Sequence, residues 1–278
     1  KANEEDLLLS GRTDMERQVR VSVIMGVYNG EKTLNAAIQS IVDQTMTDWE
    51  LIICNDCSTD RTGELLREWM GREPRIRCLE NASNMRLAAS LNRCIEAAEG
   101  KYIARMDDDD ISYPERLWLE ADFLDRHPEY GFVSGQIDGF DGKRLIPDYW
   151  HRKEKPEKKD FLSGSQFVHP AVMFRRECLE KMGGYRTGKS TRRMEDYDLF
   201  MRLYASGYKG YNIQKPLMRY TISTEKDKYR FRIDEAKVRW QGYCRLGLMP
   251  WGAVWALRPL LVGLIPKRLL LALKTRKG

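Results

Sequence analysis

Four consecutive carboxylates at 107–110 are the residues of this chain best suited to bind a metal ion. They follow a short apolar run, 102–106, and the turn formers Gly100 and Ser112 bound the whole segment, a pattern typical of a buried strand. Clustered carboxylate oxygens bind hard cations such as Mg²⁺ or Mn²⁺, often together with substrate phosphates. An isolated acidic run is more often a solvated turn. Because ligands bind at the carboxyl ends of strands in open α/β sheets, we instead predict a divalent-metal site here.

A second pair of carboxylates, Glu195 and Asp196, opens a stretch with helical spacing at 194–204. Acidic residues are common in the first turn of a helix, where the dipole favours their ionised form, and that is the ordinary explanation for such a pair. A carboxylate in this position is also suited to act as a general base toward a hydroxyl within hydrogen-bond reach. Spacing alone leaves both interpretations open.

The segments that position these carboxylates alternate between β-type and helical patterns. The predicted strands are 19–25, 49–54, 75–79 and 102–106, and the predicted helices are 31–45, 60–72 and 87–98. This order predicts a mainly parallel sheet flanked by helices. Right-handed connections then bring three polar loops to one edge of the sheet: 28–29, 56–60 and 107–110.

The second half of the chain has less regular patterns. It predicts a helix at 114–126, a strand at 130–135, a hairpin or loop at 138–159, a sheet edge at 165–174, and helices at 177–182 and 194–204. The segment 165–174 is placed at an edge because Pro170 lacks the N–H that a central strand needs.

The composition is that of a soluble globular protein, with 278 residues, 42% of them hydrophobic and 32% charged, and a net charge of +6. This length accommodates one large domain with an appendage. The net charge does not discriminate between nucleic acid, anionic lipid and a phosphorylated substrate. Six scattered cysteines do not resemble a disulfide scaffold, and the polar first 20 residues do not resemble a signal peptide, so we expect a cytoplasmic protein.

The C-terminal part differs from the rest. Residues 229–245 form a basic helical pattern, and 246–266 are nearly all apolar apart from Arg258. This length could just span a bilayer, but a central arginine costs about 2.5–3.5 kcal/mol on insertion scales, and Pro259 interrupts the helix. We favour an interfacial position with Trp251 and Trp255 at headgroup depth and the basic residues on anionic lipid. The alternative is a soluble helical hairpin packed against the main domain or a second subunit.

Four motifs together resemble a known family. They are Val-Ser-Val-Ile-Met-Gly-Val-Tyr-Asn at 21–29, Asn-Asp-Cys-Ser-Thr-Asp at 55–60, Tyr-Ile-Ala-Arg-Met-Asp-Asp-Asp-Asp at 102–110 and Glu-Asp-Tyr-Asp-Leu at 195–199. In this order and spacing, over about 19–220, the chain resembles the family-2 inverting glycosyltransferases of the GT-A fold. The resemblance implies a metal-dependent transfer of a sugar from a nucleotide-diphosphate donor, most often UDP, to an acceptor hydroxyl.

The resemblance also assigns roles to particular residues. The metal ligands are Asp107 and Asp109, as the first and third positions of the DxD motif, and the catalytic base is Asp196. The residues implied in donor-nucleotide binding are Val27, Tyr28, Asn29, Asp56, Arg86, Asp107 and Asp108. The chain departs from the family pattern in having Gly26 for proline, Cys57 for glycine, and Asp108 where close relatives have alanine.

Four further residues are candidates for acceptor or phosphate contacts: Glu195, Arg192, Arg193 and His169. Arginine pairs clamp diphosphates well, although a solvated basic loop accounts for 189–193 equally. His169 is equally explained as a structural histidine.

We therefore predict an N-terminal leader at 1–18, a GT-A domain at 19–222 and a C-terminal helical, membrane-associating extension at 223–278. The expected partners are a nucleotide-diphosphate sugar, a saccharide or lipid-linked saccharide acceptor and an anionic membrane surface, and we expect no nucleic acid. The enzyme would lie on the inner face of the cell membrane and contribute to cell-surface polysaccharide synthesis. We leave open whether it forms a homo-oligomer.

Two other functions compete with this one. A metal-dependent nucleotidyltransferase would also use clustered aspartates, but the first loop, 26–30, lacks the lysine-bearing glycine-rich pattern expected of it. A non-catalytic nucleotide-sugar-binding protein is the other alternative, and the presence of Asp107, Asp109 and Asp196 argues against it.

Overall fold

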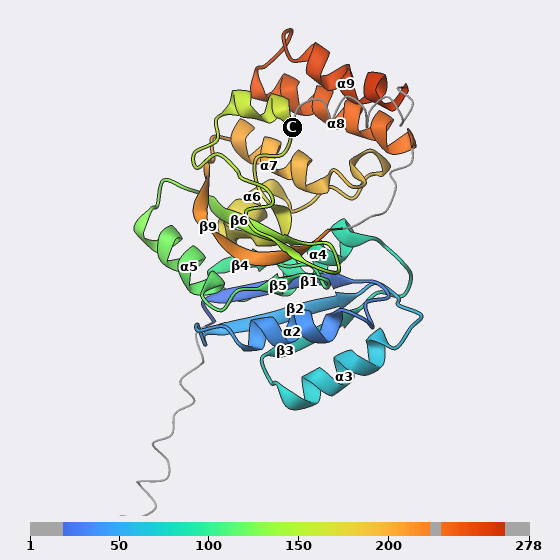
Figure 1. Ribbon diagram of the computed structural model, residues 1–278, viewed down its shortest axis with the longest axis vertical. Coiled ribbons are helices and arrows are strands. Elements are labelled where there is room, and N and C mark those ends of the chain that lie inside the picture. The colour runs from blue at the N-terminus through green and yellow to red at the C-terminus, as the bar shows by residue number, and fades with distance from the viewer. Residues whose placement is uncertain (1–18, 223–228, 265–278) are drawn as a thin grey trace, which may run out of the picture.

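The computed structural model describes residues 19–222 and 229–264, and its first half is a parallel sheet built from the predicted apolar runs (Figure 1). The strand β1 (Val21–Val27) lies between β2 (Trp49–Asn55) and β4 (Tyr102–Arg105), and β3 (Ile76–Glu80) pairs with the outer side of β2. Every residue of β1, β2 and β4 is buried. Helices cover both faces of these strands, which explains why the strands have continuous rather than alternating apolar sequences.

The helices divide between the two faces of this sheet. On one face lie α2 (Leu34–Val42), α3 (Thr62–Arg72) and α5 (Arg116–Arg126), whose apolar side chains share one hydrophobic core with alternate residues of β1 and β2. On the other face lies α4 (Leu87–Ala97), which packs into a second core with the intervening strand residues. The sheet therefore presents the carboxyl ends of β1, β2 and β4 at a single edge, as predicted.

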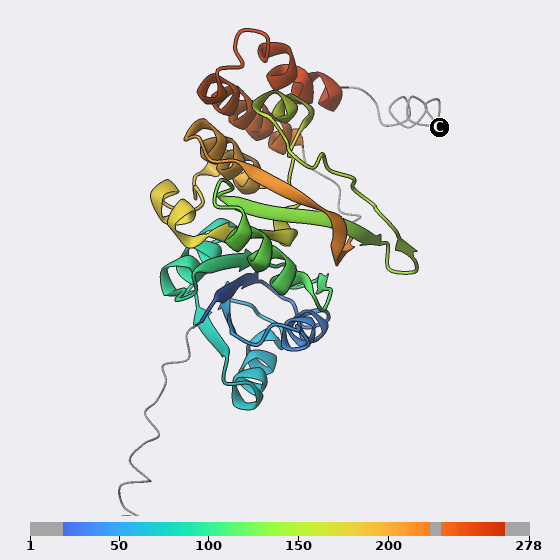
Figure 2. The ribbon, with the colours of Figure 1, turned by 90° about the vertical axis from the view of Figure 1, so that its left-hand side faces the viewer.

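The second half of the chain extends the sheet with mixed strand directions. The strand β8 (Val172–Arg175) pairs antiparallel with β4, β6 (Phe132–Phe140) pairs antiparallel with β8, and β9 (Gly210–Thr221) pairs parallel with β6. The order is completed by β5 (Ile111–Ser112) beyond β9, and by β7 (Leu145–Ile146), which forms a hairpin with β6. Figure 2 shows the long β6–β9 pair turned away from the plane of β1–β3, so that the sheet curls.

Two expectations about this half were wrong. The sheet is mixed rather than mainly parallel, because β8 enters beside β4 in the opposite direction. The segment that contains β8 is not an edge, since β8 lies between β4 and β6. Pro170 does not disturb this pairing because it lies in the short helical turn η2 (His169–Ala171), just before the strand begins. The strand β9 was not among the predicted elements, whereas the hairpin expected within 138–159 forms between β6 and β7.

The helices α6 (Arg176–Met182) and α7 (Glu195–Ala205) follow β8, and the C-terminal helices pack beyond them. The helix α8 (Tyr229–Leu246) contacts α7, and α9 (Ala253–Leu264) contacts α8. Tyr243 of α8 belongs to the same hydrophobic core as α7 and β8. Among the helices of 19–222 and 229–264, none is long and apolar enough to cross a membrane. The predicted leader 1–18 and the basic stretch 267–277 lie outside the described residues.

Candidate active site

The loops that follow β1 and β2 are joined by hydrogen bonds at the carboxyl edge of the sheet. The backbone N–H of Asn29 donates to Ser58 Oγ (2.9 Å), and the side-chain oxygen of Asn29 accepts from the N–H of Thr59 (2.8 Å). Val27 is buried beneath this junction, whereas the ring of Tyr28 is 50% exposed at the rim. These loops lie next to the acidic turn, because Gly30 approaches Asp108.

Asp56 organises the loop that leads into α4. Its carboxylate is buried and accepts three hydrogen bonds, all of 2.7 Å: from Asn81 Nδ2, from the backbone N–H of Met85 and from the backbone N–H of Arg86. A carboxylate has about four acceptor sites, so one lone pair of Oδ2 remains for a ligand. Asp56, one of the residues implied in donor-nucleotide binding, therefore also holds the backbone at the start of α4.

Arg86 is held in an unusual backbone conformation. It precedes the first residue of α4 with φ 74° and ψ 166°, a region that glycine occupies freely and other residues avoid. The hydrogen bond from its N–H to Asp56 helps to impose this conformation. The side chain itself is exposed, so packing does not account for an arginine at this position.

Replacing Arg86 with glycine is expected to stabilise the fold. Strain of this kind destabilises the folded state by about 1–3 kcal/mol, and glycine would relieve it. Glycine also gains freedom in the unfolded chain, which offsets about 0.5–1 kcal/mol of this stabilisation. We expect Arg86→Gly to raise the free energy of unfolding by about 1 kcal/mol, measured by urea denaturation. Arg86→Ala is the matched control, because alanine keeps the strain and should leave stability unchanged. Equal stability of the glycine and alanine variants would contradict the strain at this position.

The four aspartates of the acidic turn point in two directions. One carboxylate oxygen from each of Asp107, Asp109 and Asp110 lies within 4.8 Å of the others, so that the three form one cluster. The carboxylate of Asp108 turns instead toward the loop after β1, where a Cβ added to Gly30 would lie 2.5 Å from its Oδ2. The structure thus brings together the two predicted metal ligands, Asp107 and Asp109, and adds Asp110 to the cluster. The carboxylate of Asp108 lies outside this cluster.

The cluster has the chemistry of a hard-cation site. Asp110 is fully buried, and its Oδ1 accepts the backbone N–H of Thr221 (2.8 Å), whereas its Oδ2 has no hydrogen-bond partner among the described residues. The hydroxyl of Thr221 also donates to the backbone carbonyl of Asp109 (2.5 Å), which fixes the turn against β9. A buried oxygen without a partner is destabilising, and an oxygen-seeking divalent cation would satisfy it.

Burial and mutual repulsion raise the pKa values of these carboxyls. Burial, together with the charges of Asp107 and Asp109, raises the pKa of Asp108 to about 7. Burial and Asp107 raise the pKa of Asp109 to about 6 and that of Asp110 well above its usual range. The site therefore favours the binding of positive charge, either protons or a metal cation.

A buried arginine partly neutralises the cluster from below. The side chain of Arg105 is 1% exposed, and its two terminal nitrogens donate to both carboxylate oxygens of Asp107. The backbone carbonyl of Arg105 accepts from Nη2 of Arg116 (2.7 Å), which is itself buried and paired with Glu120. Arg105 therefore has a fixed position against the acidic turn, and its charge also acts on Glu195 and Asp196 in the first turn of α7.

Glu195 and Asp196 lie in the first turn of α7. Burial and the adjacent Asp196 raise the pKa of Glu195 to about 7. Burial raises the pKa of Asp196 as well, and neither the hydrogen bond from the N–H of Tyr197 nor the charge of Arg105 cancels this effect. The expectation that the helix dipole keeps these groups readily ionised is thus outweighed by desolvation. A carboxyl with a raised pKa is well matched to proton abstraction near neutral pH.

His169 lies beneath this pair as a neutral, hydrogen-bonded side chain. Its Nε2 is 2.8 Å from the hydroxyl of Tyr185. Burial, with a further contribution from the charge of Arg105, lowers the pKa of His169 well below its usual value. A neutral imidazole is a weak partner for phosphate, so the structure favours the structural alternative for this residue.

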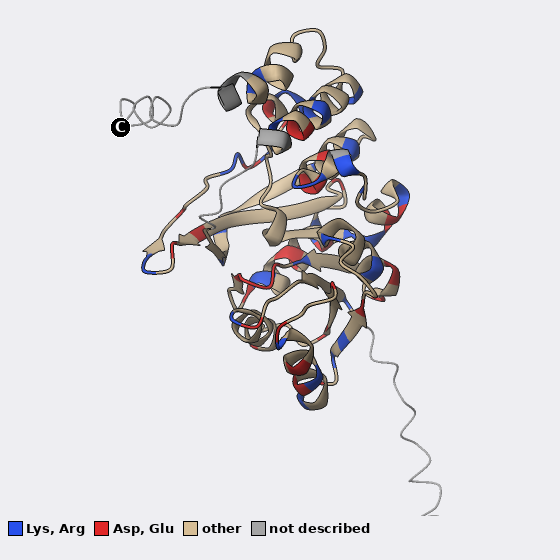
Figure 3. Ribbon diagram, turned by 90° about the vertical axis from the view of Figure 1, so that its right-hand side faces the viewer, with Lys and Arg blue, Asp and Glu red and all other residues tan. Residues whose placement is uncertain are grey.

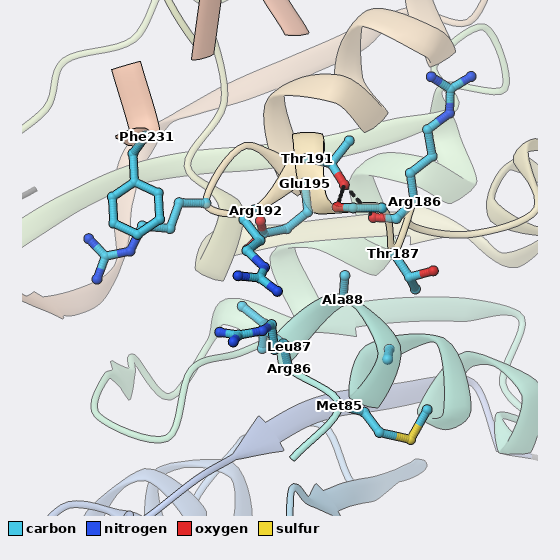
Figure 4. A pocket seen from close by; sticks show the side chains of 13 residues that line it. Met85, Arg86, Leu87, Ala88, Arg186, Thr187, Thr191, Arg192, Glu195 and Phe231 are labelled. Carbon is cyan, nitrogen blue, oxygen red and sulfur yellow. Dashed lines mark hydrogen bonds between the residues drawn. The ribbon is translucent and has the colours of Figure 1, made fainter. Parts of the chain in front are cut away.

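A cavity of about 150 Å³ lies between α4 and the 186–193 loop (Figure 4). The guanidinium of Arg186 points away from this cavity and pairs with Asp198. Arg86 and Arg192 extend into the space between α4 and this loop, and Glu195 lines the same space. The guanidinium of Arg193 packs on the ring of Phe231, 4.9 Å from its centroid. The cavity therefore combines positive charge with one of the α7 carboxyls, an arrangement suited to an anionic substrate.

Comparison with known proteins agrees with this geometry. The model of the family described as glycosyl transferase family 2 matches residues 22–183, more than half of the chain. The chain belongs to this family. The glycosyltransferase is 38% identical to the putative glycosyltransferase EpsE of Bacillus subtilis over 258 residues, which cover 89% of this chain and 90% of EpsE. It is also 28% identical to an Escherichia coli UDP-Gal:alpha-D-GlcNAc-diphosphoundecaprenol beta-1,3-galactosyltransferase, with 81% of this chain and 83% of that protein covered.

Solved structures resemble the glycosyltransferase in fold. Staphylococcus aureus TarS 1–349, crystallised with UDP, gives a TM-score of 0.65 at 20% identity, with 80% of this chain and 65% of the TarS chain covered. The mannosyltransferase PcManGT of Pyrobaculum calidifontis, in complex with GDP-Man and Mn²⁺, gives a TM-score of 0.61 at 20% identity and covers 93% of this chain. The mixed, curled sheet flanked by helices is therefore a GT-A-type fold. Membership in the family decides against a nucleotidyltransferase.

Sequence reasoning missed two residues at this site. Asp110 is adjacent to the DxD motif, but only its buried, unpartnered oxygen distinguishes it from a solvated neighbour. Arg105 precedes the motif and reads as an ordinary structural residue, although its hydrogen bonds to Asp107 make it central. A charged residue inside an apolar strand was the available signal, because such a residue is buried only with a partner.

Proposed function

We propose that this glycosyltransferase moves a sugar from a nucleotide-diphosphate donor, preferentially a UDP-sugar, to an acceptor hydroxyl with inversion and with the help of Mn²⁺ or Mg²⁺. The observation that carries the proposal is the cluster of Asp107, Asp109 and the partly unpartnered Asp110, with Arg105 bound to Asp107 and a separate pair of buried carboxyls on α7. Cation-binding and proton-accepting carboxyls are thus held apart on two elements.

The donor nucleotide is proposed to lie across the loops after β1 and β2. Tyr28 offers an exposed ring for stacking beside Val27 and Asn29, and the remaining lone pair of Asp56 suits an imide N–H such as N3–H of uracil. Arg86 extends toward the region where the diphosphate would lie. Two proteins of similar fold, TarS in complex with UDP and PcManGT in complex with GDP-Man and Mn²⁺, support a nucleotide-linked donor.

Asp107 and Asp109 are the proposed metal ligands, and Asp110 is proposed to provide a third carboxylate oxygen. Asp108 is proposed to contact the donor nucleotide. A bound divalent cation would neutralise the negative charge that grows on the nucleotide diphosphate as the glycosidic bond breaks. Arg105 keeps Asp107 in place from below, because both oxygens of that carboxylate already accept its hydrogen bonds.

Asp196 is the proposed base. Inversion requires an acceptor hydroxyl that attacks the sugar from the face opposite the leaving group, and one group that accepts its proton. Asp196 lies at the start of a helix with a raised pKa, and Glu195 beside it lines the cavity in which an acceptor could lie. Arg192 and Arg193 are proposed to contact the acceptor or the diphosphate, and His169 to position this region through Tyr185.

The acceptor is proposed to be a saccharide or lipid-linked saccharide at the inner face of the cell membrane, in cell-surface polysaccharide synthesis. The E. coli relative supports this proposal, since its name gives a diphosphoundecaprenol-linked sugar as its acceptor. A relative named for teichuronic acid biosynthesis, TuaG of B. subtilis, is 28% identical over 73% of this chain.

A thermal-shift screen tests the donor and metal assignments together. We expect UDP with Mn²⁺ to raise Tm by several degrees, because a ligand at 100 times its Kd stabilises the fold by about 2.7 kcal/mol. GDP, dTDP and CMP should give smaller shifts, and EDTA should abolish the UDP shift. A full shift with EDTA present would contradict metal dependence, and a larger shift with GDP would replace the UDP assignment.

A further inference from the structure

The helix α9 exposes apolar residues on the face that points away from the protein. Its inner face is formed by small or compact residues, Gly252 before the helix, Ala256 and Pro259, all of which are buried. The outward residues are large and apolar. Trp251, in the turn just before α9, is 86% exposed, and within the helix Val254 is 73%, Leu257 45% and Trp255 39% exposed. This set of four residues is called the α9 ridge below. The inward positions lie at i, i+4 and i+7, so packing on α8 fixes which side of the helix faces out.

A surface helix of a soluble protein normally carries polar residues on its outer face, and α3 of this chain does so. The exposed residues of α3 include Glu64, Arg67, Glu68 and Arg72. The four residues of the α9 ridge are all apolar, and the exposed charged side chain that accompanies them on α9 is that of Arg258. Contiguous exposed apolar residues of this kind mark a surface that binds a membrane or another protein.

The charge of the C-terminal sequence indicates what covers the ridge. Residues 236–278 contain nine lysines and arginines and no aspartate or glutamate, and four of the nine, Lys237, Arg239, Arg245 and Arg258, lie within the described residues. Arg258 lies one turn from Trp255, with its guanidinium 5.7 Å from the ring centroid of that tryptophan. Lys and Arg positions, with a few Asp and Glu positions among them, recur along the helices at the top of the molecule (Figure 3). A protein partner with an apolar patch would not require this one-sided charge, whereas an anionic lipid surface would.

We propose that the α9 ridge docks on an anionic phospholipid bilayer, with α9 parallel to the membrane plane. Trp251 and Trp255 lie at headgroup depth, Val254 and Leu257 reach the acyl boundary, and Arg258 pairs with lipid phosphate. The basic residues that follow 264 in the sequence add electrostatic attraction. This docking is independent of donor identity and of the catalytic assignments, so each can fail without the other.

The test uses the full chain and sedimentation with vesicles. Vesicles of 30% phosphatidylglycerol in phosphatidylcholine are compared with pure phosphatidylcholine vesicles at low and high salt. We expect binding to the anionic vesicles, weakened by salt, and a loss of affinity by a factor of about 10–100 in the double variant Trp251→Glu/Trp255→Glu. The matched control is Trp118→Glu, which alters a tryptophan of α5, away from α9, whose exposed fraction (46%) is similar to that of Trp255 (39%). This variant should bind as the unmodified chain does.

Three results would overturn the proposal. The first is equal vesicle binding by the double variant and the Trp118→Glu control. The second is no binding of the unmodified chain to anionic vesicles. The third is a self-association of the chain, measured by analytical ultracentrifugation, that the double variant abolishes while vesicle binding persists, since the ridge would then be a subunit interface. A UDP-dependent thermal shift retained in the double variant shows that the fold and the nucleotide site are intact.

Discussion

Replacing Asp196 with asparagine is expected to lower the rate of sugar transfer by a factor of roughly 10²–10⁴, the usual contribution of a general base. Asparagine has nearly the same shape and keeps the first turn of α7, but it cannot accept the proton of the acceptor hydroxyl. Because Asp196 is not part of the acidic cluster, Mn²⁺-dependent nucleotide binding should survive. Transfer is measured by release of nucleoside diphosphate, and binding by calorimetry.

Glu195→Gln is the comparison that identifies the base within the pair. Glu195 lines the cavity and has a raised pKa of about 7, so it is the other candidate. If Asp196 is the base, the Glu195 variant should keep most of its kcat and change mainly KM for the acceptor. The opposite ranking, with transfer lost in Glu195→Gln and retained in Asp196→Asn, would move the role to Glu195.

Replacing Asp109 with asparagine is expected to abolish metal-dependent donor binding and to slow transfer by roughly a thousandfold, since a bound cation contributes several kcal/mol of charge stabilisation. The reason is geometric, because Asp109 contributes one of the three clustered carboxylate oxygens. Mn²⁺ binding is measured directly by electron paramagnetic resonance, with UDP present and absent, so that the result does not depend on turnover.

Asp108→Asn is the matched control for this variant. The two residues are adjacent and both have raised pKa values, but the carboxylate of Asp108 faces Gly30 rather than the cluster. We expect Asp108→Asn to retain Mn²⁺ binding and to weaken the nucleotide at most modestly. Equal losses of Mn²⁺ in both variants would show that the cluster includes Asp108.

The parallel half of the fold could be predicted from the sequence because its signals are local. Each strand from β1 to β4 is an apolar run, each intervening helix has its own periodicity, and right-handed connections leave few alternatives for their order. The position of β8 could not be predicted in this way. It depends on pairing with β4, whose sequence lies some 70 residues earlier, and no local pattern records the direction of such a pairing. The strand β9 is polar or half-exposed at many positions, so its sequence lacks a clear period.

The candidate site shows the same division between local and nonlocal information. The order of the elements predicts that the acidic turn lies near the loops after β1 and β2. The directions of the side chains within the turn depend instead on residues far away in the sequence. Thr221 of β9 orients Asp110, and the absence of a side chain at Gly30 leaves room for Asp108. Likewise, the basic and apolar composition of the C-terminal part suggested a membrane surface, but only the packing of α9 on α8 showed which residues face outward.

Asp107, the partner of Arg105, couples two equilibria that a reaction scheme usually treats separately. Burial is the main cause of the raised pKa of Asp196; the charge of Arg105 lowers this pKa, and the negative charge of Asp107 adds a smaller increase. A second cation on Asp107 would remove part of that repulsion and make Asp196 a stronger acid. Thermodynamic linkage then requires the reverse: the deprotonated enzyme holds the cation more tightly than the protonated one. Donor loading and readiness of the base would therefore rise together with pH, through one shared carboxylate.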